Sequence, residues 1–206
     1  MKLFGCLLAG LLLVLTGCAS DPFTRATKAG IHIVQLAPVE YGDMRFGPPP
    51  STSRLDDPWG MNRTDMMNDV GQDGLHRMQK LMQKQNLDVP QMVYDHVKAQ
   101  LEKQSEFTIT TKPPADGTLT VKVVQFGFVD VPFSLMHELP FITLQAELRD
   151  KTGHKIWTRK TSFSLPASDE AGASWDEYES HPDELRDEWI GQVSHAVQRL
   201  FPDQND

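Results

Sequence analysis

The chain has 206 residues, 39% of them hydrophobic, and carries a net charge of −8 at pH 7. This acidic excess excludes the basic footprint of nucleic-acid binding and disfavours attachment to an anionic membrane through a basic patch. The length suits a single domain with a core of modest size.

The first 17 residues have the organisation of a secretory signal. Lys2 is followed by an apolar stretch from Leu3 to Leu15 and then by small residues. The stretch of about 13 residues is shorter than the roughly 17 to 25 that a membrane-spanning helix needs. We therefore expect residues 1–17 to be a signal peptide that is removed.

Leu15, Thr16, Gly17 and Cys18 read L-T-G-C, which resembles the lipobox of bacterial lipoproteins. The resemblance implies cleavage before Cys18, a diacylglyceryl group on its thiol and an acyl chain on its freed amine. Three chains hold a protein on a membrane effectively permanently, because each buried methylene contributes about 0.8 kcal/mol. In enterobacterial lipoproteins Asp after the cysteine resembles an inner-membrane retention signal. Ala19 stands here, so we expect the outer membrane, with the domain facing the periplasm.

The alternative is an ordinary secretory signal in which Cys18 carries no lipid. Cys6 lies within the predicted signal peptide, so the mature protein has no second cysteine for an internal disulfide. Residues 18–30 continue from the cysteine with small, polar or charged side chains. They are predicted to tether a single domain, residues 31–206, to the membrane.

The domain begins with a strand and an insertion. Residues 31–39 are mostly apolar and end at Tyr41-Gly42-Asp43, which predicts a strand buried on both faces and central in its sheet. Residues 44–86 break this pattern with a run of prolines and indicate an insertion. Apolar residues at three- and four-residue spacing predict an amphipathic helix within it, formed by Met67, Val70, Gly74, Met78, Leu81 and Met82.

A first main helix is expected from Asp88 to about Gln104. Asp88 and Gln91 have the spacing of a capping box, and Pro90 is tolerated in the first turn. Apolar residues recur on one face of this helix, at Val89, Met92, Val93, Val97 and Leu101.

Strands follow this helix. Phe107 and Ile109 alternate with threonines as in a short strand. Residues 119–128 predict a long strand with a bulge near Val124, because the apolar positions change phase there. Residues 142–148 alternate between apolar and polar side chains, and residues 150–153 (D-K-T-G) predict a hairpin turn to a return strand. One solvated face indicates antiparallel pairing. The return strand carries Trp157, Phe163 and Leu165.

Residues 167–179 are small and acidic and predict a loop. Ser180 is expected to cap a final helix that Pro202 ends. The order of elements predicts an α+β fold, with a four- or five-stranded, mainly antiparallel sheet, two main helices on one face and a partly helical insertion. The apolar stripe of the final helix comprises Leu185, Trp189, Val193, Ala196, Val197 and Leu200.

The element order and residues 148–157 (L-R-D-K-T-G-H-K-I-W) resemble periplasmic lipoproteins that are similar to the amino-terminal domain of TolB and to ABC-transport auxiliary lipoproteins. In those families a strand ending in Asp, a turn with Gly and a returning aliphatic-Trp pair precede a terminal helix. The resemblance covers roughly residues 31–201 without 44–86. It implies a protein-binding accessory role in the cell envelope and no catalysis.

Several patterns could carry chemistry, and each has a simpler interpretation. The histidines lack zinc-ligand spacing, and His137-Glu138 lacks the second histidine of a zinc protease motif. Thioethers bind Cu(I), but methionines on helix faces more often fill the core. These methionines are Met61, Met66, Met67, Met78, Met82 and Met92. An acidic cluster lacks EF-hand spacing; it comprises Asp169, Glu170, Asp176, Glu177, Glu179, Asp183 and Glu184.

These observations predict a non-catalytic outer-membrane lipoprotein that binds another envelope protein or assembles into a complex. No catalytic residue, metal site or cofactor is expected apart from the lipid on Cys18. Exposed aromatic residues are candidates for partner contact, and they come from Trp59, Phe126, Phe128 and Phe133. The alternative is a periplasmic protein that binds a small molecule, lipid or Cu(I), and an enzyme is the third hypothesis.

Overall fold

The computed structural model describes residues 22–46, 74, 76–104, 107–130, 138–163 and 173–202. The predictions for the signal peptide, Cys18, Met61, Met66 and Met67 lie outside these residues. None of the helices in the described part of the chain has the length and hydrophobicity to cross a bilayer.

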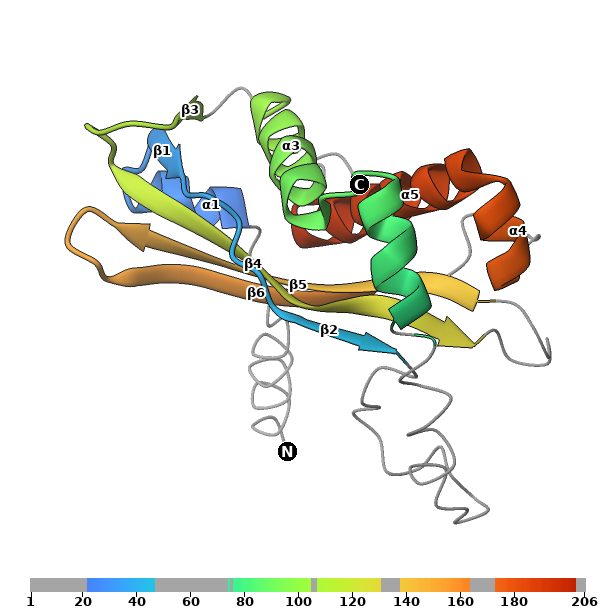
Figure 1. Ribbon diagram of the computed structural model, residues 1–206. Helices are drawn as coiled ribbons and strands as arrows, with labels where there is room; N and C mark the ends of the chain where they lie inside the picture. Colours follow the sequence, from blue (N-terminus) through green and yellow to red (C-terminus); the bar gives the residue numbers. More distant parts are fainter. Residues whose placement is uncertain are drawn as a thin grey trace, which may run out of the picture.

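Six strands form one sheet (Figure 1). Its order is β3-β1-β4-β5-β6, and β2 also pairs with β4. β1 and β2 lie one after the other along the same edge of β4, so the sheet is five strands wide. The strands are β1 (Ile33–Leu36), β2 (Asp43–Phe46), β3 (Thr108–Thr110), β4 (Gly117–Asp130), β5 (Glu138–Asp150) and β6 (Lys155–Phe163).

The long ladders between β4, β5 and β6 are antiparallel, as predicted. The shorter ladders of β1 with β3 and β4, and of β2 with β4, are parallel. The predicted α+β class and mainly antiparallel sheet are therefore confirmed, with a parallel edge that the alternation of side chains did not indicate.

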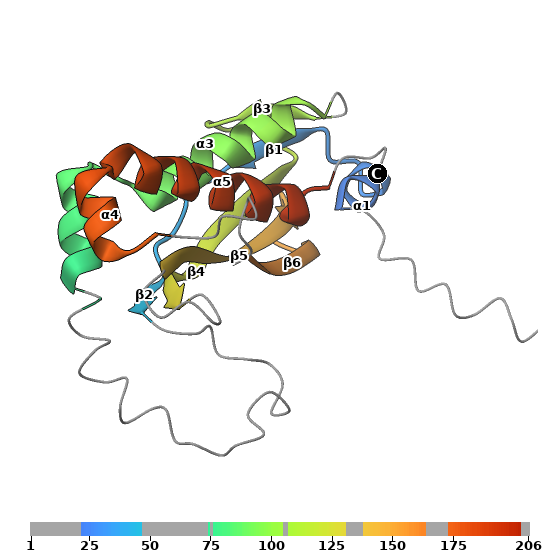
Figure 2. The ribbon, with the colours of Figure 1, turned by 90° about the vertical axis from the view of Figure 1, so that its right-hand side faces the viewer.

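Helices cover one face of the sheet, and α3 and α5 lie side by side on it (Figures 1 and 2). The core between them and the sheet contains Val93, Val97, Leu144 and Trp189, each fully buried. The predicted apolar stripes of both helices therefore face the sheet. The helices are α1 (Pro22–Lys28), α3 (Val89–Glu102), α4 (Trp175–Ser180) and α5 (Pro182–Leu200), with a further helical stretch at 76–84.

The bulge predicted near Val124 is confirmed. The register between β4 and β5 shifts between Val123 and Gln125, which places one unpaired residue on β4. Because of this extra residue, Val123 before the bulge and Phe126 after it both point to the helical face and are buried.

The hairpin turn at 150–153 is also confirmed. The Asp150 carboxylate accepts hydrogen bonds from the backbone N–H of Thr152 (2.8 Å) and of His154 (3.0 Å). A hydrogen bond from the Thr152 hydroxyl is the main cause that lowers the pKa of Asp150, and these two backbone bonds lower it further. Gly153 has φ +85°, a conformation that favours glycine.

The beginning of the domain differs from the prediction. Residues 22–28 form α1 instead of part of a tether, and Ala26 is buried in the core. β1 is buried on one face only, since Ile33 is 37% exposed while Val34 and Leu36 are buried. The chain does not leave the sheet at Tyr41-Gly42-Asp43 but continues into β2.

The insertion and the acidic segment differ as well. Residues 43–46 belong to the sheet, and helix 76–84 contributes Met78, Leu81 and Met82 to the same core as α3 and α5. The predicted loop at 167–179 contains α4, which Ser174 and Glu177 cap with a complete capping box. Ser180 ends α4 and does not cap the final helix, which follows His181.

Candidate functional site

The candidate site is a groove between the β1–β2 connection and the start of α3. Its volume is about 430 Å³, within the roughly 300 to 1,000 Å³ of ligand-binding clefts. The lining combines apolar, aromatic and a few polar side chains, from Leu36, Pro38, Val39, Tyr41, Asp88, Pro90, Gln91, Tyr94 and Thr111.

The α3 wall of the groove is fixed by local capping. The Asp88 carboxylate accepts a hydrogen bond from the backbone N–H of Gln91 at 3.1 Å, as an N-cap should. Gln91 does not complete the predicted capping box, because its side chain donates to Asp95. Val89 and Pro90 are buried, so the first turn of α3 is held on the core while Asp88 stays exposed.

The opposite wall depends on a close approach of two backbone segments, because the β1–β2 connection runs parallel to β4 beside its bulge. A Cβ at Gly42 would lie 2.6 Å from the carbonyl carbon of Val124 and closer still to the carbonyl oxygens of Val123 and Val124. Only glycine fits where the chain runs this close to the β4 bulge. Hydrogen bonds from Glu40 N–H to Val121 O and from Val123 N–H to Glu40 O hold the two segments together as a parallel bridge.

Tyr41, between Glu40 and Gly42 of this connection, lines the groove. It is 62% exposed, and its ring packs on Phe126 with centroids 6.3 Å apart. Phe126 in turn packs edge-on against Trp189 of α5 at 6.1 Å. The exposed ring is therefore supported by the buried core, which limits the entropy it loses on contact with a partner.

The polar groups that line the groove are one carboxylate and several uncharged side chains. Partial burial of its hydroxyl raises the pKa of the otherwise exposed Tyr41, and the nearby negative charge of Asp88 raises it further. The Tyr41 hydroxyl therefore stays protonated and can donate a hydrogen bond. Among the lining residues that the structure describes, Asp88 is the one carboxylate, and none is a lysine, arginine or histidine. The groove is thus suited to an apolar segment that also offers a cation or a hydrogen-bond acceptor.

A second cavity bears on the lipid-carrier hypothesis. It lies between the sheet and the helices, where Ala26, Leu101 and Trp157 are among the apolar residues that line it. Its volume is about 20 Å³, close to that of one water-sized sphere. An acyl chain does not fit in this space.

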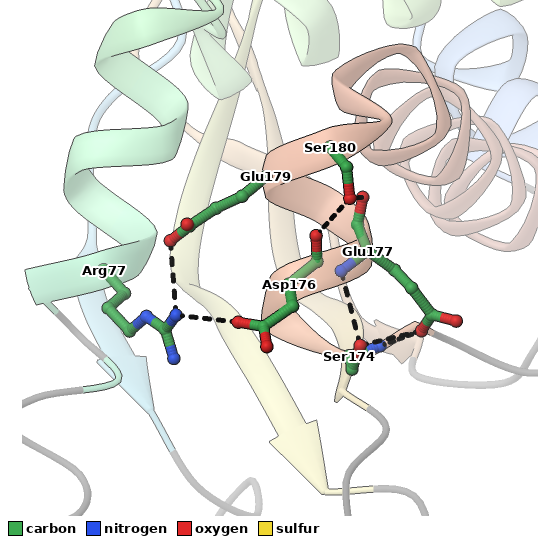
Figure 3. A network of polar contacts seen from close by, with 6 residues as sticks. All are labelled: Arg77, Ser174, Asp176, Glu177, Glu179 and Ser180. Carbon is green, nitrogen blue, oxygen red and sulfur yellow. Dashed lines mark hydrogen bonds and ion pairs between the residues drawn. The ribbon is translucent and has the colours of Figure 1, made fainter.

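The acidic residues of 176–179 have structural roles on α4 (Figure 3). Arg77 of the neighbouring helical stretch pairs with Asp176 at 3.1 Å and with Glu179 at 3.4 Å. Glu177 accepts a hydrogen bond from the Ser174 N–H as part of the capping box. Within the described residues, no three His, Cys, Asp or Glu side chains are grouped so that they could hold a metal ion.

A half-buried carboxylate, that of Glu188, joins α4 to α5. The Tyr178 hydroxyl donates to Glu188 at 2.7 Å and accepts from the Ala173 N–H at 3.2 Å. Burial raises the pKa of Glu188 despite this hydrogen bond, and the neighbouring Glu184 raises it further. The pair fixes α4 to the final helix and does not line the groove.

The other residues singled out in the sequence lie in or against the core, or outside the described residues. Met78 and Met82 are buried in the core, and Met92 is half-buried against it. Phe126 and Phe128 are also core residues. The remaining candidates lie outside the described residues, namely Leu15, Thr16, Gly17, Cys18, Trp59, Phe133, His137, Asp169 and Glu170.

The groove itself was not predicted. Tyr41 and Gly42 looked like the end of a strand, and Asp88 looked like a helix cap alone. The signal that could have indicated the groove is Tyr41 beside Gly42, because the apolar pattern requires neither an aromatic residue nor a glycine at this point. A parallel strand at this edge is what brings Tyr41 close to Asp88.

No protein-family model matches the chain, and no curated protein matches it. Solved structures that resemble it include a protein from Xanthomonas campestris of the family DUF330, at 13% identity and a TM-score of 0.44, covering 82% of this chain and 81% of that one. The PelC dodecamer from Paraburkholderia phytofirmans has 8% identity and a TM-score of 0.34, covering 84% and 88%. A minor lipoprotein from Acinetobacter baumannii has 12% identity and a TM-score of 0.31, covering 53% and 83%.

Proposed function

We propose that the chain is a non-catalytic lipoprotein of the outer membrane, anchored by lipid on Cys18, whose domain binds another envelope protein. The anchor is supported by the sequence L-T-G-C directly behind a short apolar run. No cofactor is needed for this role beyond the covalent lipid.

The observation that carries the binding role is the groove with Tyr41 at its mouth. A ring that is 62% exposed yet supported by Phe126 is the kind of residue that dominates protein interfaces, because burying tyrosine contributes strongly at little entropic cost. Apolar walls from Pro38 and Val39 and the charge of Asp88 then favour an apolar partner segment with a basic residue.

Site-specific photocrosslinking in intact cells tests this role. A photoreactive phenylalanine analogue at Tyr41 is expected to crosslink one identified envelope protein, and the same analogue at Ile190 of α5 is the matched exposed control. Asp88→Lys should abolish the Tyr41 crosslink, whereas Asp88→Asn, which retains the helix cap, should weaken it. A crosslink of equal yield from Ile190, or one unaffected by Asp88→Lys, would remove the groove as the binding site.

The groove volume also suits a small molecule, which is the second candidate function. Native mass spectrometry of the protein purified from the envelope separates the two. A small ligand retained by wild type and lost in Tyr41→Ala, without a protein crosslink, would favour a periplasmic binding protein over an assembly accessory.

A further inference from the structure

The charges of the domain are unevenly distributed. α1 and β6 together carry five basic and no acidic residues, and all five side chains are exposed. α4 and α5 carry seven acidic residues against two basic ones. The net charge of −8 therefore conceals a basic region, here called the basic edge, formed by Arg25, Lys28, Lys155, Arg159 and Lys160.

The two regions lie at different places on the molecule. α1 packs against β6, the outermost strand of its side of the sheet. α1 and α4 are at opposite ends of the sheet in both views (Figures 1 and 2). The acidic residues of α5 all fall within 183–188, at the end next to α4. Within the basic edge, Lys155 also pairs with Glu147 at 3.6 Å.

The position of the lipid anchor relative to α1 indicates which end of the domain faces the membrane. Cys18 and Pro22, the first residue of α1, are four residues apart. Four Cα–Cα steps span at most about 15 Å whatever their conformation. A lipid on Cys18 therefore keeps α1, and the β6 edge on which it packs, within a short distance of the bilayer surface.

We propose that the basic edge lies against the membrane and contacts the phosphates of anionic phospholipid head groups, so that the acidic end of the domain points away. This inference rests on the lipid anchor of the proposed function. The anionic membrane surface favours this orientation in two ways. It attracts the basic α1 and β6, and it repels the acidic α4 and the start of α5. The groove is then held at a fixed orientation instead of sampling all directions on a flexible tether.

Energy transfer from dye-labelled protein to head-group-labelled lipid tests the orientation. The acylated mature protein has no other thiol, since Cys6 is removed with the signal peptide. Thr158→Cys on β6 and Ser180→Cys at the end of α4 place a dye at either end without changing the charge. The protein is reconstituted in vesicles of phosphatidylcholine alone or with about one third phosphatidylglycerol.

Transfer from position 158 should exceed transfer from position 180 in the anionic vesicles. The difference should shrink in phosphatidylcholine and at about 1 M salt, where the Debye length is about 3 Å, to the part that the short link to the lipid imposes alone. Each basic side chain near an anionic surface contributes about fivefold to association. Lys28→Gln with Arg159→Gln should therefore lower the preference for the oriented state about 25-fold.

A matched variant controls for net charge and folding. Lys80→Gln with Lys84→Gln makes the same charge change at exposed positions of helix 76–84 and should leave the transfer unchanged. Equal transfer from positions 158 and 180 on anionic vesicles, or an asymmetry in phosphatidylcholine as large as that on anionic vesicles, would overturn the inference. Mass spectrometry of the purified protein separates the two levels. If Cys18 carries acyl chains but positions 158 and 180 show equal transfer, the proposed orientation is wrong and the anchor stands. If Cys18 is unacylated, both the anchor and the orientation are wrong.

Discussion

We expect the substitution Gly42→Ala to destabilise the domain more than a glycine-to-alanine substitution at an exposed turn. The new Cβ would lie 2.6 Å from the carbonyl carbon of Val124, within backbone that side-chain rotation cannot move. The β1–β2 connection must therefore lift away from β4.

The cost can be worked from the contacts that this movement breaks. Two backbone hydrogen bonds join Glu40 to Val121 and Val123, and each contributes about 0.5 to 1.5 kcal/mol. The Tyr41–Phe126 ring contact adds about 0.5 to 1.5 kcal/mol. Gly42→Ala should lower the free energy of unfolding by about 2 to 4 kcal/mol, and the melting temperature by roughly 5 to 15 °C for a domain of this size.

Urea denaturation of the mature chain with Cys18→Ser measures this change. Gly153→Ala is the matched control, since Gly153 has φ +85° but nothing within 4 Å of an added Cβ. Its cost should be near the strain of a left-handed residue, about 1 to 2 kcal/mol. If the free energy of unfolding of Gly42→Ala lies within about 0.5 kcal/mol of the wild-type value, the β1–β2 connection does not approach the β4 bulge closely enough to hold Tyr41 in place.

Three further results are expected. Asp88→Asn should lower the pKa of Tyr41 toward its usual value, as followed by tyrosinate absorbance. The raised pKa means that folded protein holds this proton more tightly, so stability attributable to Tyr41 should fall as pH rises above about 10. Glu188 also has a raised pKa, so its contribution to the free energy of unfolding is present at acidic pH and is lost as pH rises through its folded pKa. In urea titrations Glu188→Gln should therefore be more stable than wild type at neutral pH, and this gain should vanish below about pH 4. Arg77→Ala should change the free energy of unfolding by less than about 1 kcal/mol, because its two ion pairs are exposed, and a larger loss would assign Arg77 a role beyond them.

Local sequence patterns predicted the elements whose contacts are themselves local or periodic. The apolar stripe through Trp189 identified α5, and the change of phase around Val124 identified the bulge, because burial on one face leaves a clear period. The Asp150 turn was equally clear, since one carboxylate there satisfies two nearby N–H groups.

The parts that sequence did not predict depend on distant segments. β2 has four residues and pairs with β4 about 80 residues later, so no local period marks it. α1 was mistaken for tether because Ala26, the one buried residue among the α1 side chains that the structure describes, is small. Ser180 was assigned to the wrong helix because Ser174, six residues earlier, already caps α4. The groove follows from these long-range pairings, which explains why Tyr41 was not recognised.

The most direct test of the central claim is metabolic labelling with a palmitate analogue, followed by membrane fractionation, of wild type and Cys18→Ser in a Gram-negative host. A lipid-anchored protein should be labelled on Cys18 and fractionate with the outer membrane, and Cys18→Ser should lose the label and either remain uncleaved or become soluble. Wild-type protein that is unlabelled and free in the periplasm would contradict the account and leave a diffusible binding protein in its place.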